Sequence, residues 1–209
     1  MTTDLTSALA GARILPVLTV PSEEMAAPLA AALVAGGARC AEVTFRTAAA
    51  EQVVKAMAAH GGLVVGAGTV LTAEQAKRAV AAGARFVVSP GFDDEVVAKC
   101  LELGVPVVPG VATATELMRA LRAGLDTVKL FPAESLGGVD TLRALAAPFP
   151  QARFVPTGGI GPDRLSGYLA EPSVLAVGGS WMAPGALLER GDHAEIRRLT
   201  AQAVERSTR

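Results

Sequence analysis

The chain has 209 residues and an almost balanced charge, with 19 Lys and Arg against 20 Asp and Glu and a formal net charge of −1. This balance gives no electrostatic reason to expect binding to nucleic acid or to an anionic membrane surface. Hydrophobic residues make up 51% and charged residues 19%, a composition that argues against disorder. The length suits one compact core, so we expect a single domain over residues 1–209.

The N-terminal residues do not have the pattern of a signal peptide. They lack a basic region, and Arg13 interrupts their apolar part. The longest uncharged stretch, residues 172–188, is broken by glycines and prolines and does not read as a membrane span. Cys40 and Cys100 stand far apart, which fits a reducing compartment. We therefore expect a soluble, cytoplasmic protein.

Short apolar runs alternate along the chain with Ala-rich amphipathic segments. The runs, which we predict to be strands, are Ile14–Val20, Ala41–Arg46, Leu63–Thr69, Phe86–Ser89, Val105–Val108, Thr127–Phe131, Arg153–Thr157 and Val174–Gly179. The helices are predicted near residues 22–35, 48–59, 73–82, 93–103, 114–123, 138–147, 163–170 and 192–206.

This alternation predicts the fold. Strands that are each followed by a helix pair in parallel, because the tight turns of hairpins are missing. Strands that are apolar on both sides belong to a sheet covered on both faces. Eight such units close into a barrel, whereas an open doubly wound sheet usually has fewer strands. We predict an α/β fold, a (β/α)8 TIM barrel, with a short extra helix over residues 2–11.

The second predicted strand carries charges on its inward-facing side. Its odd positions are apolar and should face the helices, which leaves Glu42, Thr44 and Arg46 on the inner face. Glu42 and Arg46 would lie about 13 Å apart along the strand, so they do not simply neutralise each other. Burying both is costly without other partners. They belong either to a functional site or to a structural ion network across the barrel.

Lys129 differs from the other three lysines. Those three stand in helical segments about one turn after an acidic residue, which is typical of a solvated helix face. The pairs are Glu51 with Lys55, Glu74 with Lys77 and Glu95 with Lys99. Lys129 lies in an apolar strand, on the inward side, where burial disfavours the charged form of an amine. A neutral amine is a nucleophile suited to Schiff-base formation with a ketone. The alternative is a lysine at a strand end that reaches solvent.

Two glycine pairs follow the last two predicted strands, Gly158-Gly159 and Gly178-Gly179. Exposed backbone N–H groups with a helix N-terminus behind them bind phosphate without a basic side chain. The loops after strands seven and eight are also the usual phosphate site of eight-stranded barrels. Tight turns use glycine pairs as well. Their joint placement nevertheless favours a phosphate site.

Other motifs are less informative. The segment Gly66–Gly68 lacks the third glycine and the following acidic residue of a dinucleotide fingerprint, so we exclude that site. Thr69 is better placed to donate its hydroxyl to a substrate carboxylate. Neither His60 nor His193 stands in a catalytic setting, and carboxylates do not cluster. We therefore expect no metal and no other cofactor.

Seven short motifs follow one another in register from about residue 10 to the end of the chain. They are Glu42–Thr47, Gly66–Leu71, Ser89–Gly91, Pro109–Gly110, Lys129–Glu134, Pro156–Ile160 and Gly178–Trp181. Together they resemble the 2-keto-3-deoxy-6-phosphogluconate (KDPG) aldolase family.

This resemblance implies a class I, metal-independent aldolase of the Entner-Doudoroff pathway, a (β/α)8 barrel that is commonly a homotrimer. It implies that the substrate is a phosphorylated 2-keto acid, KDPG, which is split into pyruvate and glyceraldehyde 3-phosphate. Lys129 would form the Schiff base and Glu42 would be the general acid/base. The residues implied to bind substrate are Arg46 and Thr69 at the carboxylate, Pro90 and Phe131 at the pocket wall, Thr157 at the hydroxyl groups, and Gly158, Gly159, Gly179 and Ser180 at the phosphate.

One departure from the family pattern bears on the substrate. Some relatives carry a basic residue on the first strand where this chain has Thr19, which leaves the phosphate to backbone donors and Ser180. One alternative is an aldolase for 4-hydroxy-2-oxoglutarate or for the galactonate epimer of KDPG. The other is a phosphate-binding barrel without a Schiff base, an isomerase or a ligand-binding module, in which Lys129 only neutralises an anion.

Overall fold

The computed structural model describes residues 9 and 11–208. Its strands are β1 (Ile14–Leu18), β2 (Cys40–Thr44), β3 (Val64–Gly68), β4 (Val87–Val88), β5 (Val107–Val108), β6 (Gly110–Val111), β7 (Thr127–Leu130), β8 (Arg153–Phe154) and β9 (Val177–Gly179). Its helices are α2 (Ala26–Ala35), α3 (Ala50–His60), α4 (Ala73–Ala81), α5 (Asp94–Glu102), α6 (Ala114–Arg122), α7 (Gly138–Ala146), α8 (Leu165–Leu169), α9 (Gly185–Glu189) and α10 (His193–Ser207), with 3-10 turns η1 (Glu23–Met25) and η2 (Glu134–Leu136). The extra helix predicted over residues 2–11 falls mainly on residues 2–8 and 10, which lie outside the described residues.

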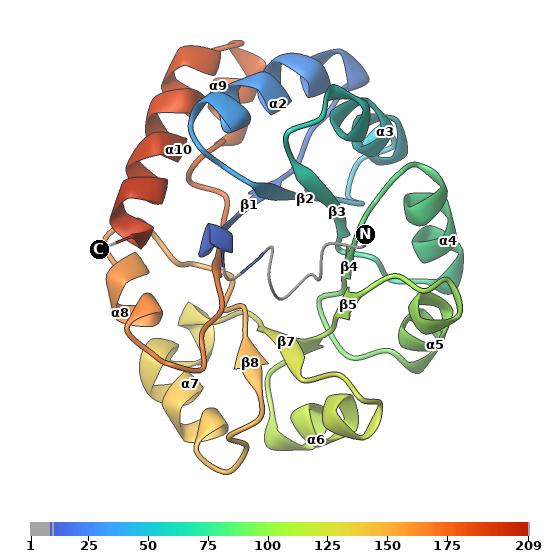
Figure 1. Cartoon of the computed structure of the whole chain (residues 1–209), viewed down its shortest axis with the longest axis vertical. Helices are drawn as coiled ribbons and strands as arrows, with labels where there is room; N and C mark the ends of the chain where they lie inside the picture. The colour runs from blue at the N-terminus through green and yellow to red at the C-terminus, as the bar shows by residue number, and fades with distance from the viewer. Residues whose placement is uncertain (1–8, 10, 209) are drawn as a thin grey trace.

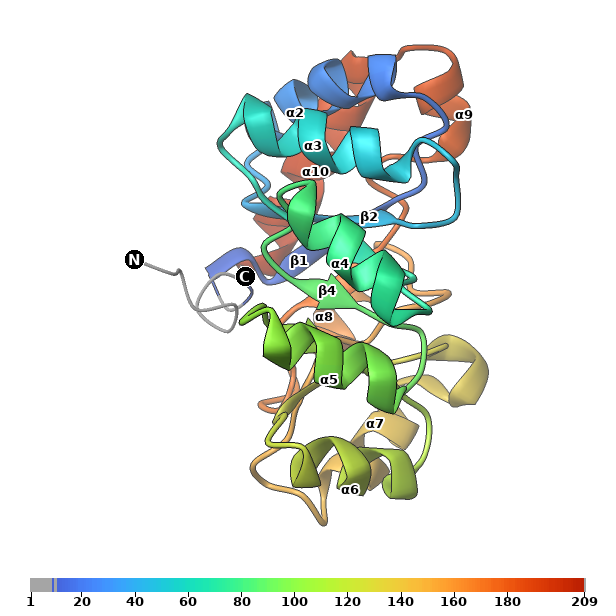
Figure 2. The ribbon, with the colours of Figure 1, turned by 90° about the vertical axis from the view of Figure 1, so that its right-hand side faces the viewer.

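The strands pair in parallel and form two sheets, in the orders β5-β4-β3-β2-β1-β9 and β6-β7-β8. Isolated bridges join Phe154 to Val174 and Thr157 to Gly178, so the chain after β8 also lies beside the β9 segment. Figure 1 shows the strands at the centre of the molecule and the helices around them. In Figure 2, α3, α4, α5 and α6 follow one another along the outside. The predicted α/β class, with a curled parallel sheet, is confirmed.

Several strands are shorter than predicted, and in two places a proline interrupts the pairing. The strand predicted over 105–108 is followed by a second short strand, with Pro109 between them: β5 pairs with β4, whereas β6 pairs with β7. Proline has no N–H to donate, so it interrupts the ladder. Pro156 falls likewise inside the strand predicted over 153–157, of which only Arg153–Phe154 is regular. The short helix α9 is absent from the prediction.

Nearly every strand residue is buried, but successive side chains pack into different clusters, as the period of two requires. Ala41 and Val43 of β2 belong to an apolar cluster that contains residues of α2 and α3. Cys40 belongs instead to an inner cluster, which contains Leu15, Val88 and Val108 of other strands and Phe86, Val155 and Ala176 next to strand ends. Glu42, two positions after Cys40, therefore lies on the strand face turned away from the helices.

Side-chain caps fix where four of the helices begin. Thr72, Asp93, Thr113 and Asp192 each accept a hydrogen bond from the backbone N–H three residues later, at the starts of α4, α5, α6 and α10. Thr113 and Glu116 form a reciprocal capping box. The first three caps lie in loops that follow strands, at the end of the sheet where the site is built. In residues 9 and 11–208, no helix has the length and apolar character needed to cross a membrane.

Both cysteines are reduced and fully buried, and burial raises the pKa of Cys40 to about 12 and that of Cys100 to about 11. The thiolate is the reactive form of cysteine. We therefore expect the folded protein to react with Ellman's reagent at mildly alkaline pH far more slowly than the protein unfolded in guanidinium chloride. The absorbance of the released thiol compound measures both rates. Equal rates would contradict the buried placement.

Candidate active site

The centre of the site is a buried ion pair between β2 and β7. The ammonium Nζ of Lys129 donates to Oε1 of Glu42 at 3.2 Å, across 87 residues of sequence. The two side chains are 6% and 0% exposed, so the alternative of a lysine that reaches solvent is wrong. Oε2 of Glu42 accepts no hydrogen bond from any described residue.

The strands beside β2 and β7 carry glycine next to the pair, and neither glycine has room for a side chain. Gly68 of β3 pairs in register with Thr44 of β2, and a Cβ on Gly68 would lie 2.0 Å from Oε1 of Glu42. Gly110 of β6 pairs in register with Lys129, and a Cβ there would lie 2.1 Å from the carbonyl oxygen of Pro90. A side chain at either glycine would displace its neighbours, so the backbone itself forms these walls.

Phe131 forms another side of the lysine's environment. The Nζ of Lys129 lies 5.2 Å from the centre of its ring, a cation–π distance. Phe131 stands two residues after Lys129 in the chain, so the two side chains point to the same face. A cis peptide bond joins it to Pro132.

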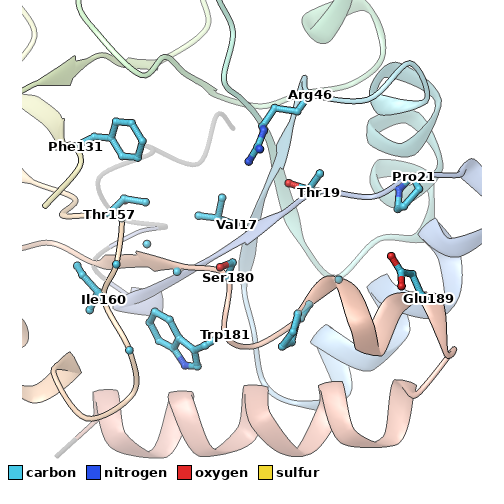
Figure 3. A pocket seen from close by; sticks show the side chains of 18 residues that line it. Val17, Thr19, Pro21, Arg46, Phe131, Thr157, Ile160, Ser180, Trp181 and Glu189 are labelled. Atoms are coloured by element: carbon cyan, nitrogen blue, oxygen red, sulfur yellow. The ribbon is translucent and has the colours of Figure 1, made fainter. Parts of the chain in front are cut away.

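A cavity of ≈ 810 Å³ opens beside the pair, at the ends of the strands (Figure 3). Seven predicted substrate-binding residues line it: Arg46, Phe131, Thr157, Gly158, Gly159, Gly179 and Ser180. Lys129 and Glu42 are not lining residues, but Phe131, which lines the cavity, lies against Lys129. Val17, which lines the cavity, pairs in register with Glu42.

Thr69 and Pro90 do not line this cavity, in contrast to the other predicted binding residues. Thr69 directly follows Gly68, the glycine against Glu42, and has a φ of 55°. That left-handed conformation is unusual for a β-branched residue, and such strain is concentrated at functional sites. The carbonyl oxygen of Pro90 lies against Gly110, which is the register partner of Lys129. Each of the two residues is thus next to a glycine that faces or pairs with a member of the ion pair.

Arg46 lies beyond β2, which ends at Thr44, and is not on the strand as predicted. Its guanidinium extends into the cavity, which Thr19 also lines (Figure 3). Among the described residues it has no ion-pair partner, so the ionic contact across the sheet involves Lys129 and Glu42 and not Arg46.

The glycine end of the cavity offers backbone donors. Gly158 and Gly159 have φ values of 102° and 78°, and their N–H groups donate to no acceptor within the described part of the chain. The hydroxyl of Ser180 is exposed there. A helix N-terminus was predicted behind the loop, but α8 begins only at Leu165 and has five residues. The free backbone donors at this end of the cavity are therefore the N–H groups of Gly158 and Gly159, and no long helix begins directly behind them.

Some lining residues were not predicted. Glu189 lies on the unpredicted helix α9, and Trp181 belongs to a quoted motif to which no role was given. A Cβ on Gly179 would lie 1.5 Å from the Trp181 ring, so the ring packs directly on this glycine. Gly179 was therefore the sequence feature that could have pointed to Trp181 as a lining residue. Thr19 shares a hydrogen bond of 2.9 Å with the hydroxyl of Thr44.

The other lysines lie on exposed helix faces, although two predicted partners are wrong. Lys77 pairs with Glu74 at 4.0 Å as predicted. Lys99 pairs with Glu102, and Glu51 pairs with Arg78 of the neighbouring helix. Their long side chains reach the nearest acid on either side, which spacing alone does not determine. Among residues 9 and 11–208, no three His, Cys, Asp or Glu side chains gather as a metal site would require.

Comparison with known proteins agrees with this geometry. The model of a family described as KDPG and KHG aldolase matches residues 5–199. The 2-dehydro-3-deoxy-phosphogluconate aldolase of Treponema pallidum is 52% identical over 199 residues, which are 95% of each chain. The KHG/KDPG aldolase of Escherichia coli K12 is 45% identical over 204 residues, 97% of this chain and 96% of the relative.

A solved structure extends the likeness to the fold. It is a KDPG aldolase from Legionella pneumophila with pyruvate captured at low pH as a covalent carbinolamine intermediate. It is 38% identical, has a TM-score of 0.92, and is matched over 96% of this chain and 98% of its own. With the buried lysine and glutamate in place beside the cavity, the chain belongs to the KDPG and KHG aldolase family.

Proposed function

We propose that this chain is a class I aldolase that cleaves KDPG to pyruvate and glyceraldehyde 3-phosphate through a Schiff base on Lys129. The observation that carries the proposal is the buried contact between Lys129 and Glu42 beside the cavity. Family membership supports it, since the relatives from T. pallidum and E. coli are named for this cleavage. The covalent pyruvate in the L. pneumophila neighbour supports the Schiff-base route.

The proposal includes a single catalytic domain over residues 1–209, folded as an eight-unit barrel. In this view β5 and β6 are one strand interrupted by Pro109, whose carbonyl oxygen accepts from the N–H of Lys129 at 2.9 Å. The N–H of Gly178 donates to the carbonyl of Pro156 at 2.9 Å, beside the isolated bridges. These contacts support closure between neighbouring units. The helix over residues 2–11 stays a prediction.

The first chemical step needs a neutral amine. Glu42 is within hydrogen-bond distance of the Lys129 ammonium and takes its proton. The amine then attacks the C2 ketone of the substrate and forms a carbinolamine. Loss of water, assisted by the protonated Glu42, gives an iminium ion, which withdraws electrons from the adjacent carbon–carbon bond.

The second step breaks the C3–C4 bond. The Glu42 carboxylate removes the proton of the C4 hydroxyl, for which its free Oε2 is the available acceptor. The bonding electrons move to the iminium nitrogen, so that an enamine and the aldehyde form. Protonation of the enamine at C3 and hydrolysis then release pyruvate and restore the amine.

Binding is divided between the region of the ion pair, where Thr69 and Pro90 lie outside the cavity lining, and the glycine end of the cavity. Arg46 and Thr69 hold the carboxylate that becomes that of pyruvate, while Pro90 and Phe131 shape the pocket around the reacting carbons. Thr157 contacts the hydroxyl groups. The phosphate is held by the residues of the glycine end, namely Gly158, Gly159, Gly179 and Ser180.

A second candidate substrate is 4-hydroxy-2-oxoglutarate, which has a carboxylate in place of the phosphorylated tail. The observation in its favour is that Arg46 is the one basic side chain among the described lining residues, so the phosphate end has none. The E. coli relative is named for both substrates. The ratio of kcat/KM on the two substrates, and on the galactonate epimer of KDPG, distinguishes these activities. The homotrimer and the cytoplasmic location stay predictions.

Lys129→Ala removes the proposed nucleophile. We expect it to abolish turnover and the borohydride-trapped pyruvate adduct, while the circular dichroism spectrum stays that of the wild type. Peptide mapping of the wild-type adduct should locate the label at Lys129. Trapping in the Ala variant would assign the chemistry to another lysine, and a wild type that binds phosphosugars without trapping pyruvate would favour the ligand-binding alternative.

Glu42→Gln keeps the size of the side chain but removes its basicity. We expect kcat to fall by roughly 10²- to 10⁴-fold, the usual contribution of general acid–base catalysis. Pyruvate binding, measured by calorimetry, should weaken much less. Equal losses of turnover and of binding would indicate instead that Glu42 has a structural role.

Gly68→Ala tests the position of the carboxylate. The added Cβ would overlap Oε1 of Glu42, which therefore must move. We expect kcat to fall by roughly 10²-fold, because a displacement of about 1 Å at a reacting group has that effect. Gly91→Ala is the control, since a Cβ there meets no atom within 4 Å. Similar kcat values for the two variants would contradict the role given to Gly68.

A further inference from the structure

Glu134 lies against the outer side of the segment Thr157–Gly159, which we call the glycine loop. The N–H of Ala133 donates to the carbonyl of Thr157 at 2.8 Å, and the N–H of Glu134 donates to that of Gly158 at 3.0 Å. The Glu134 stem also packs on Gly159, where an added Cβ would lie 2.8 Å from Cβ of Glu134. Both the backbone and the side chain of Glu134 therefore bear on the loop.

The carboxylate of Glu134 is held at both oxygens. The hydroxyl of Tyr168 donates to Oε1 at 2.7 Å, and Nη1 of Arg164 lies 2.6 Å from Oε2. The Glu134 side chain is 17% exposed, and Tyr168 is fully buried. Burial raises the pKa of Tyr168, with a smaller contribution from Glu134, so the hydroxyl remains a donor. Glu134 is thus fixed in one position.

These contacts restrain a loop that has little restraint of its own. Gly158 and Gly159 both have positive φ values, and glycine has the widest range of backbone conformations. Arg164 and Tyr168 follow the glycine loop in sequence. Their contacts with Glu134 therefore connect the chain after the loop to the residue that lies against the outer side of the loop. Donors held in place before a ligand arrives bind it more tightly, since less conformational entropy is lost.

We propose that Glu134, held by Tyr168 and Arg164, is a positioning residue that keeps the glycine loop in its phosphate-binding conformation and so sets the preference for phosphorylated substrates. This inference rests on the proposed function, which assigns the phosphate to that loop. Glu134 lies outside the cavity lining and does not touch the reacting atoms. Its effect should therefore appear in binding of the phosphorylated substrate and not in the chemical step.

The test compares two substrates that share the pyruvate half. We expect Glu134→Gln to raise the KM for KDPG by about tenfold, and to change kcat on either substrate and the KM for 4-hydroxy-2-oxoglutarate by less than about twofold. Tyr168→Phe removes only the hydroxyl, keeps the buried ring, and should have the same pattern. This second variant covers the case in which Glu134→Gln does not fold.

Glu171→Gln is the matched control. Glu171 is 14% exposed and pairs with Arg143 at 2.6 Å, as Glu134 pairs with Arg164, but it has no described contact with the glycine loop. This control should leave both KM values at those of the wild type. A rise that is equal for both substrates, or a lower melting temperature with unchanged KM values, would overturn the proposal. Failure of the proposed function would appear separately, as a wild-type protein that does not trap pyruvate.

Discussion

The ion pair between Lys129 and Glu42 is the contact on which the rest of the site depends. Removing two charges from water costs several kcal/mol per ion, and their attraction offsets this only in favourable geometry. An apolar pair would fill the same space with less cost, so stability does not account for the charges. Under the proposed function, proton transfer between them does, because it leaves an amine that can attack a ketone. The surrounding residues keep both groups buried.

Glycines shape the site as much as the residues with side chains do. Two glutamates of this chain each pack against a glycine of a neighbouring segment: Glu42 against Gly68, and Glu134 against Gly159. The first lies inside the curled sheet and the second lies outside the loop that borders the cavity. In both cases the absent Cβ allows a carboxylate stem to approach the backbone directly. Contact between a glutamate and a glycine thus occurs both at the ion pair and at the glycine loop.

The sequence predicted best what depends on strand alternation. A period of two was enough to turn Glu42 and Lys129 inward, and the order of strands and helices was enough for the fold class. It predicted less well what depends on loops. The interruption at Pro109 and the helix carrying Glu189 were not expected, because segments of two to five residues have too little periodicity. Arg46 was expected on a strand for the same reason, since nothing in the sequence marks where the ladder ends.

The charges around the cavity cancel. Among the described lining residues Arg46 and Glu189 are the only ones with an ionisable side chain, one basic and one acidic, and the pair of Lys129 with Glu42 likewise joins one base to one acid. The chain net charge of −1 adds no strong attraction for an anion. Under the proposed function, capture of the phosphate then depends on diffusion and on short-range contact with oriented N–H dipoles, which dissolved salt screens little at such distances. Ionic strength should thus have little influence on how often substrate enters.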